Sequence, residues 1–178
     1  MDVVVKACLT SWGWVGTAAS SVGLLGTALP MASRGEALAI LLLRWPHAQE
    51  ALSPLLASLH QTLSRYFEGE RVDLTDVALD VRRATEFQLR VWDVVRSIPR
   101  GRVRSYKWVA VQAGSSLASR AVGRVMATNP FPIVVPCNRV VGQDGSLTGF
   151  GGGLEMKRRL LRMEGVTLPV PPFLTTAA

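Results

Sequence analysis

The residue best suited to covalent chemistry is Cys137, which lies in the stretch IVVPCNRVV. The approach to it is rich in proline, at Pro130, Pro132 and Pro136. This composition holds the backbone rigid, which is unusual for a cysteine that only fills space. A cysteine attacks as its thiolate, and a thiol with a pKa of about 8.5 is only slightly ionised at neutral pH. Arg139 could lower that pKa, so these residues alone leave a packed thiol and a nucleophile as equal readings.

The cysteines and histidines of the chain give little support for a metal site. The chain has two cysteines, Cys8 and Cys137, and two histidines, His47 and His60, with no CxxC pair. A structural zinc site takes about four nitrogen or sulfur ligands, so we predict no metal site. We interpret Cys8 as a small apolar core residue.

Basic side chains gather in the stretch that leads to Cys137. The chain has 178 residues, 48% of them hydrophobic, and a net charge of +7. Between residues 90 and 139 the only acid is Asp93, whereas the bases are Arg90, Arg96, Arg100, Arg102, Arg104, Lys107, Arg120, Arg124 and Arg139. Clustered basic charge gains free energy by releasing the counterions of phosphates. We therefore predict a nucleic-acid-binding face here.

The segment LASRAVGRVMATN carries small residues near one side of a predicted helix, at Ala118, Ser119, Ala121 and Gly123. Arg120 projects from this helix and Arg124 follows one turn later. A recognition helix that enters a groove and a helix that packs closely on its neighbour both fit this pattern. Tyr106, at the start of the preceding helix, could stack on a base or serve as an ordinary amphipathic residue.

An N-terminal α+β unit, residues 1–82, is predicted from alternating and helical patterns. The runs 12–19 and 22–29, joined at Ser20-Ser21, predict a β-hairpin. Residues 36–44 predict a short helix, and Ser53-Pro54 caps a second helix that Gly69 ends. The polar stretch 70–83 then connects this unit to the second one.

A C-terminal unit, residues 83–178, is predicted to be mostly helical. A capping box of Thr85 and Gln88 opens one helix, and further helices are predicted over 106–113, 117–128 and 154–164. Two short helices joined by a glycine turn outline a helix-turn-helix. We expect IVVP to be a buried extended segment and the tail from Pro169 to Ala178 to be frayed. No apolar run reaches the ~18 residues of a membrane span, so we expect an intracellular protein.

Several segments together resemble the O6-alkylguanine-DNA alkyltransferases, also called methylated-DNA–protein-cysteine methyltransferases. They are TEFQLRVWDVVRSIPRGRVRSY, SRAVGRVMATNPFPIVVPCNRVV, GSLTGFGGGLEMKRRLL and RMEG. These segments run from about Thr85 to Gly165 almost without a gap. The resemblance implies a ribonuclease-H-like N-terminal unit and a winged helix-turn-helix-like element in the C-terminal unit. It also implies a monomer that works in the cytoplasm of a prokaryote or the nucleus of a eukaryote.

The resemblance further implies a mechanism. The helix with Arg120 would dock in the minor groove of double-stranded DNA, and Arg120 would fill the space of a flipped nucleotide. Its DNA contacts would include Ala118, Ser119, Ala121, Gly123, Arg124 and Arg139. Cys137 would take the alkyl group of O6-alkylguanine, or of O4-alkylthymine, with Tyr106 donating a hydrogen bond to the leaving base. The product is a stable thioether, so each molecule would act once, without a cofactor.

Other positions carry family roles by the same resemblance. Asn129 would brace the active-site turn, and Glu164 would end a hydrogen-bond relay. The substrate pocket would include Pro132, Val135, Pro136, Phe150, Gly151 and Gly152. The family usually has tyrosine at Phe150 and serine at Gly151, so this chain lacks two hydroxyl groups.

The sharpest departure from the family pattern PCHRV is Asn138, because asparagine is no base near neutral pH. We expect it to orient a water and bridge to Glu164, with altered activation of the thiol. One rival reading is an alkyltransferase-like lesion binder that transfers nothing; such relatives replace the cysteine, which this chain keeps. Another is a helix-turn-helix regulator that reads undamaged DNA.

Overall fold

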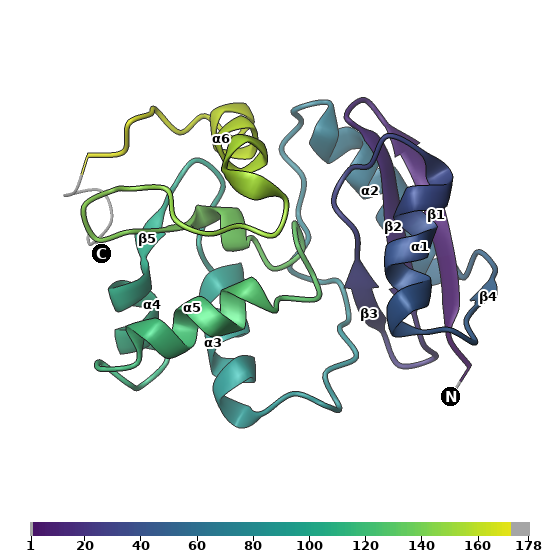
Figure 1. Cartoon of the computed structure of the whole chain (residues 1–178), viewed down its shortest axis with the longest axis horizontal. Helices are drawn as coiled ribbons and strands as arrows, with labels where there is room; N and C mark the ends of the chain where they lie inside the picture. Colours follow the sequence, from purple (N-terminus) through teal and green to yellow (C-terminus); the bar gives the residue numbers. More distant parts are fainter. Residues whose placement is uncertain (1, 172–178) are drawn as a thin grey trace. The chain divides into compact units, whose positions relative to one another are not determined.

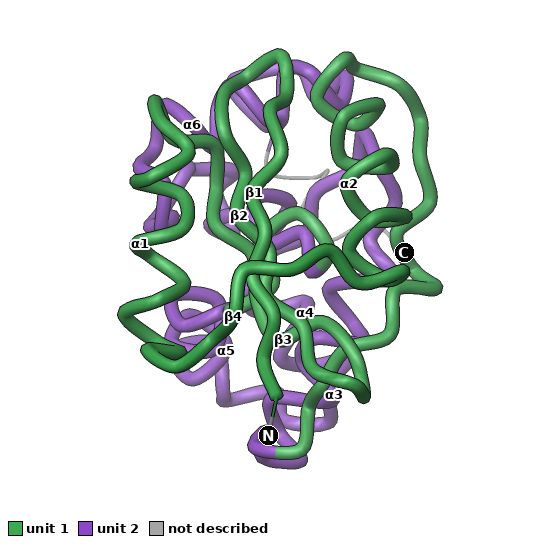
Figure 2. Tube along the Cα trace, turned by 90° about the vertical axis from the view of Figure 1, so that its right-hand side faces the viewer, with its two compact units in different colours: residues 1–82, 130–134 green, residues 83–129, 135–178 purple. Residues whose placement is uncertain are grey.

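The structure is a computed structural model that describes residues 2–171. The chain divides into two compact units, coloured separately in Figure 2. The first unit contains the residues up to 82 together with 130–134, and the second contains 83–129 and the chain from 135 onward. The fold is of the mixed α+β class, as the sequence predicts.

A four-stranded sheet forms the centre of the first unit, with the strand order β3-β2-β1-β4 (Figure 1). Its strands are β1 (Val4–Thr10), β2 (Gly13–Ala19), β3 (Leu24–Thr27) and β4 (Gln49–Glu50). β2 pairs with β3 in antiparallel fashion, which confirms the predicted hairpin. The sequence analysis missed β1, which pairs with β2 over its whole length. Its inward residues include Val5 and Ala7, and alanine is a weak marker of a buried strand face.

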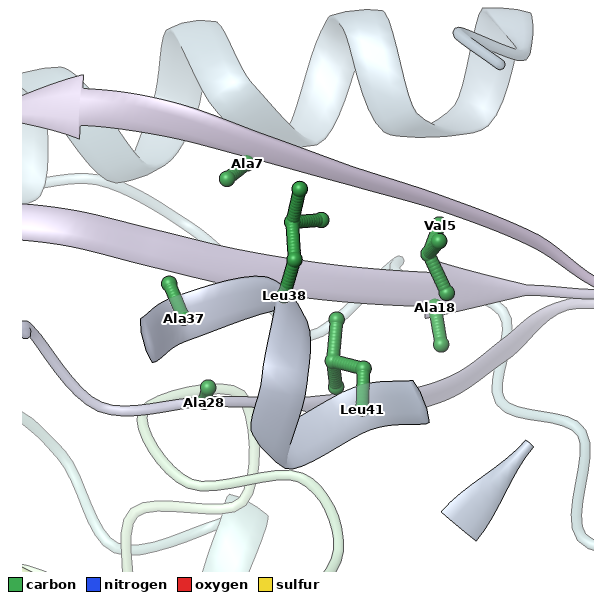
Figure 3. Close-up of a cluster of buried hydrophobic side chains, with 7 residues drawn as sticks. All are labelled: Val5, Ala7, Ala18, Ala28, Ala37, Leu38 and Leu41. Carbon is green, nitrogen blue, oxygen red and sulfur yellow. The ribbon is translucent and has the colours of Figure 1, made fainter. Parts of the chain in front are cut away.

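Two helices cover opposite faces of this sheet. α1 (Arg34–Arg44) packs through Ala37, Leu38 and Leu41 on a cluster with Val5 and Ala18 (Figure 3). α2 (Pro54–Phe67) places His60 against the hydroxyl of Thr17, at 2.7 Å. Neighbouring strand residues point to opposite faces, so Thr17 and Ala18 put the two helices on different sides.

Both helices begin with a side-chain cap, of which the one at Ser53 was predicted and the one at Ser33 was not. The Ser33 side chain accepts from the Glu36 amide at the start of α1, and the Ser53 side chain accepts from the Leu56 amide at the start of α2. Proline follows Ser53 at the first position of α2. Local hydrogen bonding at its start therefore made α2 predictable, whereas α1 was predicted from its apolar residues.

The segment 130–134 completes the first unit and corrects the prediction for IVVP. Thr27 donates its amide to the Pro130 carbonyl and its hydroxyl to the Pro132 carbonyl, both at 2.8 Å. Residues 132–134 form a turn and not a strand, with Ile133 at φ 75°. Proline at the second turn position and a positive φ at the third are the pattern of a type II turn, which overrides the strand preference of the following valines.

The second unit consists of helices around a two-stranded parallel sheet of β5 (Arg104–Ser105) and β6 (Val140–Val141). Its helices are α3 (Glu86–Arg96), α4 (Tyr106–Gln112), α5 (Ser119–Ala127) and α6 (Gly153–Met163). The capping box of Thr85 and Gln88 and the Ser105 cap are confirmed. α5 begins two residues later than predicted, with Ala118 at its N-cap and no side-chain cap. Of the predicted frayed tail, residues 172–178 lie outside the described residues, whereas Val170 is buried.

Candidate active site around Cys137

Cys137 begins a 3₁₀ turn, η1 (Cys137–Arg139), directly after the segment 130–134. Its amide donates to the Val135 carbonyl at 2.7 Å, and the Asn129 side-chain amide donates to the same carbonyl at 2.9 Å. Asn129 thus stands where a brace for this turn was predicted. Cys137 is 7% exposed. Its burial raises the pKa of the thiol, while the Asn129 side chain, the Lys157 charge and nearby backbone amides act to lower it.

Asn138 is fully buried, with 0% exposure, next to the cysteine. Among the described residues, neither its Oδ1 nor its Nδ2 has a hydrogen-bond partner. The predicted link to Glu164 is therefore not a direct bond. A buried amide without partners costs about 1–3 kcal/mol, which indicates a polar site that a water molecule would satisfy.

Glu164 and Arg139 form a buried, two-pronged ion pair. Arg139 Nε donates to Glu164 Oε2 at 2.9 Å, and Arg139 Nη2 donates to Oε1 at 3.0 Å. The side chains are only 12% and 0% exposed, and Arg139 Nη1 donates to the Ile98 carbonyl at 2.6 Å. The prediction that Arg139 contacts DNA does not fit this placement, because the guanidinium points into the unit and its donors are engaged there.

Lys157 is a functional candidate that the sequence analysis missed. It lies on α6 with 0% exposure, and its Nζ donates to the carbonyls of Val140 at 2.6 Å and Thr148 at 2.9 Å. Burial lowers the pKa of Lys157 to about 8, and the charge of a Cys137 thiolate acts in the opposite direction. The available signal was its spacing: Lys157 precedes the buried Leu160 and Leu161 by three and four residues, on the core face of the helix.

A cavity of about 530 Å³ lies in the second unit. It is lined by Tyr106, Ser119, Arg120, Gly123, Ala127, Thr148, Gly149, Phe150 and Gly151. The predicted site residues of α4, α5 and the loop before α6 thus come together here, whereas Ala127, Thr148 and Gly149 were not foreseen. Four predicted pocket residues are not part of its lining: Pro132, Val135, Pro136 and Gly152.

Tyr106 links this cavity to the cysteine. Burial raises the pKa of its phenol, a hydrogen bond with Thr148 lowers it, and the charge of a Cys137 thiolate raises it. Lys157 Nζ also lies 6.0 Å from the centre of the Tyr106 ring. Cys137 and Lys157 therefore both interact with Tyr106, which lines the cavity, whereas Cys137 itself is not part of the lining.

The outer face of α5 is open. Arg120 and Arg124 are exposed, and the small residues Ala118, Ser119 and Ala121 are half-buried. A Cβ atom added at Gly123 would meet no atom within 4 Å. The small residues of α5 therefore do not all serve packing inside the unit, and the face around Gly123 is free to approach another molecule closely.

Other chemistry has little basis in the part of the chain that is described. Residues 2–171 hold no cluster of three or more histidine, cysteine, aspartate or glutamate side chains suited to a metal ion. No helix among them is long and apolar enough to cross a membrane. Burial raises the pKa of the Cys8 thiol to about 11, so Cys8 remains a thiol at neutral pH. Cys8 is half-buried on β1 and not part of the buried core, in contrast to the prediction.

Comparison with known proteins gives a consistent picture. Residues 86–166 match the family model described as 6-O-methylguanine DNA methyltransferase, DNA binding domain. The methylated-DNA–protein-cysteine methyltransferase of Mycobacterium tuberculosis H37Rv is 49% identical over 107 residues, which cover 60% of this chain and 64% of that protein, slightly under two thirds of its length. The Haemophilus influenzae protein of the same name is 38% identical over 69% of this chain and 67% of its own length. The crystal structure of M. tuberculosis OGT in complex with DNA superposes with a TM-score of 0.74 at 35% identity, over 97% of this chain and 98% of the other.

Proposed function

The chain belongs to the methylated-DNA–protein-cysteine methyltransferase family, and on this basis we propose that it repairs O6-alkylguanine in DNA by taking the alkyl group onto Cys137. The observation that carries the proposal is the coupled group of Cys137 and Tyr106 beside a cavity that α5 lines with Arg120. Such a transfer needs a nucleophile, a hydrogen-bond donor for the leaving base and a basic helix surface that binds DNA. Cys137, Tyr106 and α5 would supply them.

For the fold, we propose a ribonuclease-H-like first unit and a winged helix-turn-helix element in the second. α4 and α5 are the paired helices, joined by the turn with Gly114 at φ 80°. In this arrangement α5 is the recognition helix. The proposed partner is double-stranded DNA, bound by one protein molecule.

We place α5 in the minor groove, with Arg120 in the space of an extruded nucleotide. Extrusion is physically required, because a stacked guanine keeps its O6 substituent out of reach of a buried thiol. The open face at Gly123 allows the helix backbone to approach the groove, and the exposed Arg124 is placed to meet a phosphate. The cavity of about 530 Å³ falls within the usual range of small-ligand sites and would receive the flipped base.

The proposed chemistry is an in-line displacement. The Cys137 sulfur forms a bond to the alkyl carbon as the bond from that carbon to guanine O6 breaks, and guanine leaves with the electron pair. Tyr106 donates a hydrogen bond to the leaving base. The thioether has no easy route to hydrolysis, so each molecule acts once, and the displacement balances without a cofactor.

The test is incubation with a duplex that contains O6-methylguanine, followed by intact-protein mass measurement. We expect a gain of one methyl group in the parent protein and none in Cys137→Ala. A gain that survives Cys137→Ala would refute the assignment of the nucleophile. Arg120→Ala should weaken binding to the lesion-bearing duplex, and unchanged binding would refute the docking of α5.

A second candidate is a lesion-binding protein that transfers nothing. The observation that favours it is Asn138, which lies beside the cysteine without a hydrogen-bond partner among the described residues and cannot act as a base. Tight binding to the methylated duplex without any gain in mass would support this candidate. If the protein instead bound an undamaged duplex of one particular sequence as tightly as the methylated duplex, it would be a helix-turn-helix regulator that reads DNA sequence.

A further inference from the structure

One buried ionisable group near the reaction site has no part in the function proposed above. Lys157 is fully enclosed, whereas lysine usually keeps its ammonium in water. Its Nζ donates to the carbonyl of Val140, which directly follows the turn that carries Cys137, and to that of Thr148, whose side chain bonds Tyr106. The charges of Lys157 and Cys137 also act on each other. The amine and the thiol thus lie close enough for their charges to interact.

We propose that Lys157 accepts the proton of Cys137 and so activates the thiol, a task that the neighbouring amide of Asn138 cannot perform. This inference rests on the proposed alkyl transfer for its setting. It concerns thiol activation, however, which can be measured without DNA.

The two carbonyl bonds let Lys157 serve in both protonation states. A neutral amine has two N–H groups and one lone pair. The N–H groups satisfy the carbonyls of Val140 and Thr148, and the lone pair then remains to accept a proton. The ammonium keeps both bonds and gains a third N–H, which stabilises a thiolate. Both carbonyl bonds are therefore kept in either protonation state.

Burial supports this role by bringing the pKa of Lys157 to about 8 from its usual value of 10.5. The titratable groups that act on Lys157 or lie against it are Cys137 on η1 and Tyr106 on α4. At low pH both Cys137 and Lys157 are protonated. As the pH rises through about 8 Lys157 loses its proton, and the neutral amine can then accept the proton of Cys137. Thiol reactivity should therefore increase with pH across this range.

The transfer step balances with this acceptor. The S–H bond breaks and its proton moves to Lys157 Nζ. The bond from sulfur to the alkyl carbon forms while the bond from that carbon to O6 breaks. Guanine leaves with the electron pair and takes one proton from water, and the hydroxide that remains is neutralised when the Lys157 ammonium returns its proton to the solvent. No group is oxidised or reduced.

The test measures alkylation of Cys137 by iodoacetamide as a function of pH, without DNA, in a Cys8→Ala background. The variants are Lys157→Met, which removes the amine, and Lys157→Arg, which keeps a positive charge that does not titrate in proteins. Arg158→Met, one residue along α6, is the matched control, and thermal melting checks that each variant folds. Methyl transfer from the O6-methylguanine duplex is measured in parallel.

We expect the parent rate to rise with a midpoint near pH 8. In Lys157→Met the rate at pH 8 should fall by about tenfold or more, since loss of a general base typically costs about 10²–10⁴-fold. Lys157→Arg should not restore it, and Arg158→Met should match the parent. A parent profile without the rise near pH 8, full reactivity of Lys157→Met, or full rescue by Lys157→Arg would each overturn the inference.

The two proposals fail in different ways. If the iodoacetamide profiles follow expectation but the duplex transfers no methyl group to any variant, the proposed function is wrong and the activation of Cys137 by Lys157 stands. If methyl transfer occurs in the parent and is unaffected by Lys157→Met, the inference is wrong and the proposed function stands.

Discussion

The buried ion pair of Arg139 and Glu164 offers the sharpest test of the site's architecture. Both Glu164 oxygens accept from Arg139, at 2.9 and 3.0 Å, and the two side chains are nearly inaccessible to solvent. Removing one partner of such a pair leaves an uncompensated buried charge, which costs about 3–5 kcal/mol. For a chain of this length each kcal/mol lowers Tm by about 2–4 °C, so Glu164→Met or Arg139→Met should lower Tm by about 6–20 °C.

Replacing both partners should be far milder. The double variant Arg139→Met with Glu164→Met carries no buried charge, and such apolar replacements are often neutral. It still loses the bond from Arg139 to the Ile98 carbonyl, which is worth about 1 kcal/mol. We therefore expect the double variant to be more stable than either single variant.

Urea and thermal unfolding of the four proteins measure this coupling as a double-mutant cycle. Arg158→Met, which breaks an exposed pair with Glu155, is the control and should cost under about 1 kcal/mol. The reasoning would be refuted if Glu164→Met cost no more than this control, or if the costs of the single variants simply added in the double variant. The first result would mean that Glu164 serves chemistry and not the stability of the turn.

Three further outcomes follow from single positions. Gly123→Ala should stabilise the free protein by about 1 kcal/mol, because alanine favours a helix and its Cβ meets no atom, yet it should weaken DNA binding in an anisotropy titration. Asn138→His should raise the single-turnover transfer rate at pH 7.5 by about tenfold or more in a quenched time course, because it adds a second base beside Cys137. Arg82 and Ser20 hold the pKa of Asp80 below its usual value, so Asp80 stabilises the fold above the unfolded pKa of about 3.9. In urea titrations Asp80→Asn should therefore lower the midpoint at pH 7, with the difference narrowing as the pH falls below 4.

The helices could be predicted because their first residues are capped by side chains that lie next to them in the sequence. Ser53 with Pro54, Thr85 with Gln88, and Ser105 each satisfy backbone amides within one turn, and all of these caps are present. Elements that depend on distant partners were harder to predict. β1 owes its existence to pairing with β2, and its small inward residues give little alternation to read.

The residue types of the site could be predicted from the sequence, but the directions in which some of its side chains point could not. Tyr106, Arg120 and Phe150 come from three separate segments and line one cavity, as family resemblance suggested. Arg139 was expected at the DNA surface, but the 3₁₀ turn points it inward to Glu164. Lys157 was missed because a lysine among basic neighbours reads as a solvent-exposed charge, and only its spacing to Leu160 and Leu161 hints at burial.

The segment 130–134 shows why the first unit matters to a site that it does not line. These residues precede the turn of Cys137 in the chain, yet they belong to the first unit. Ile133 has φ 75°, a conformation that costs a branched residue about 1–3 kcal/mol. The two bonds from Thr27, at about 1 kcal/mol each, are of the right size to offset that cost. Residues 86–166, which match the DNA-binding family model, therefore include five residues that belong to the first unit, and two of these, Pro130 and Pro132, accept hydrogen bonds from Thr27 of β3.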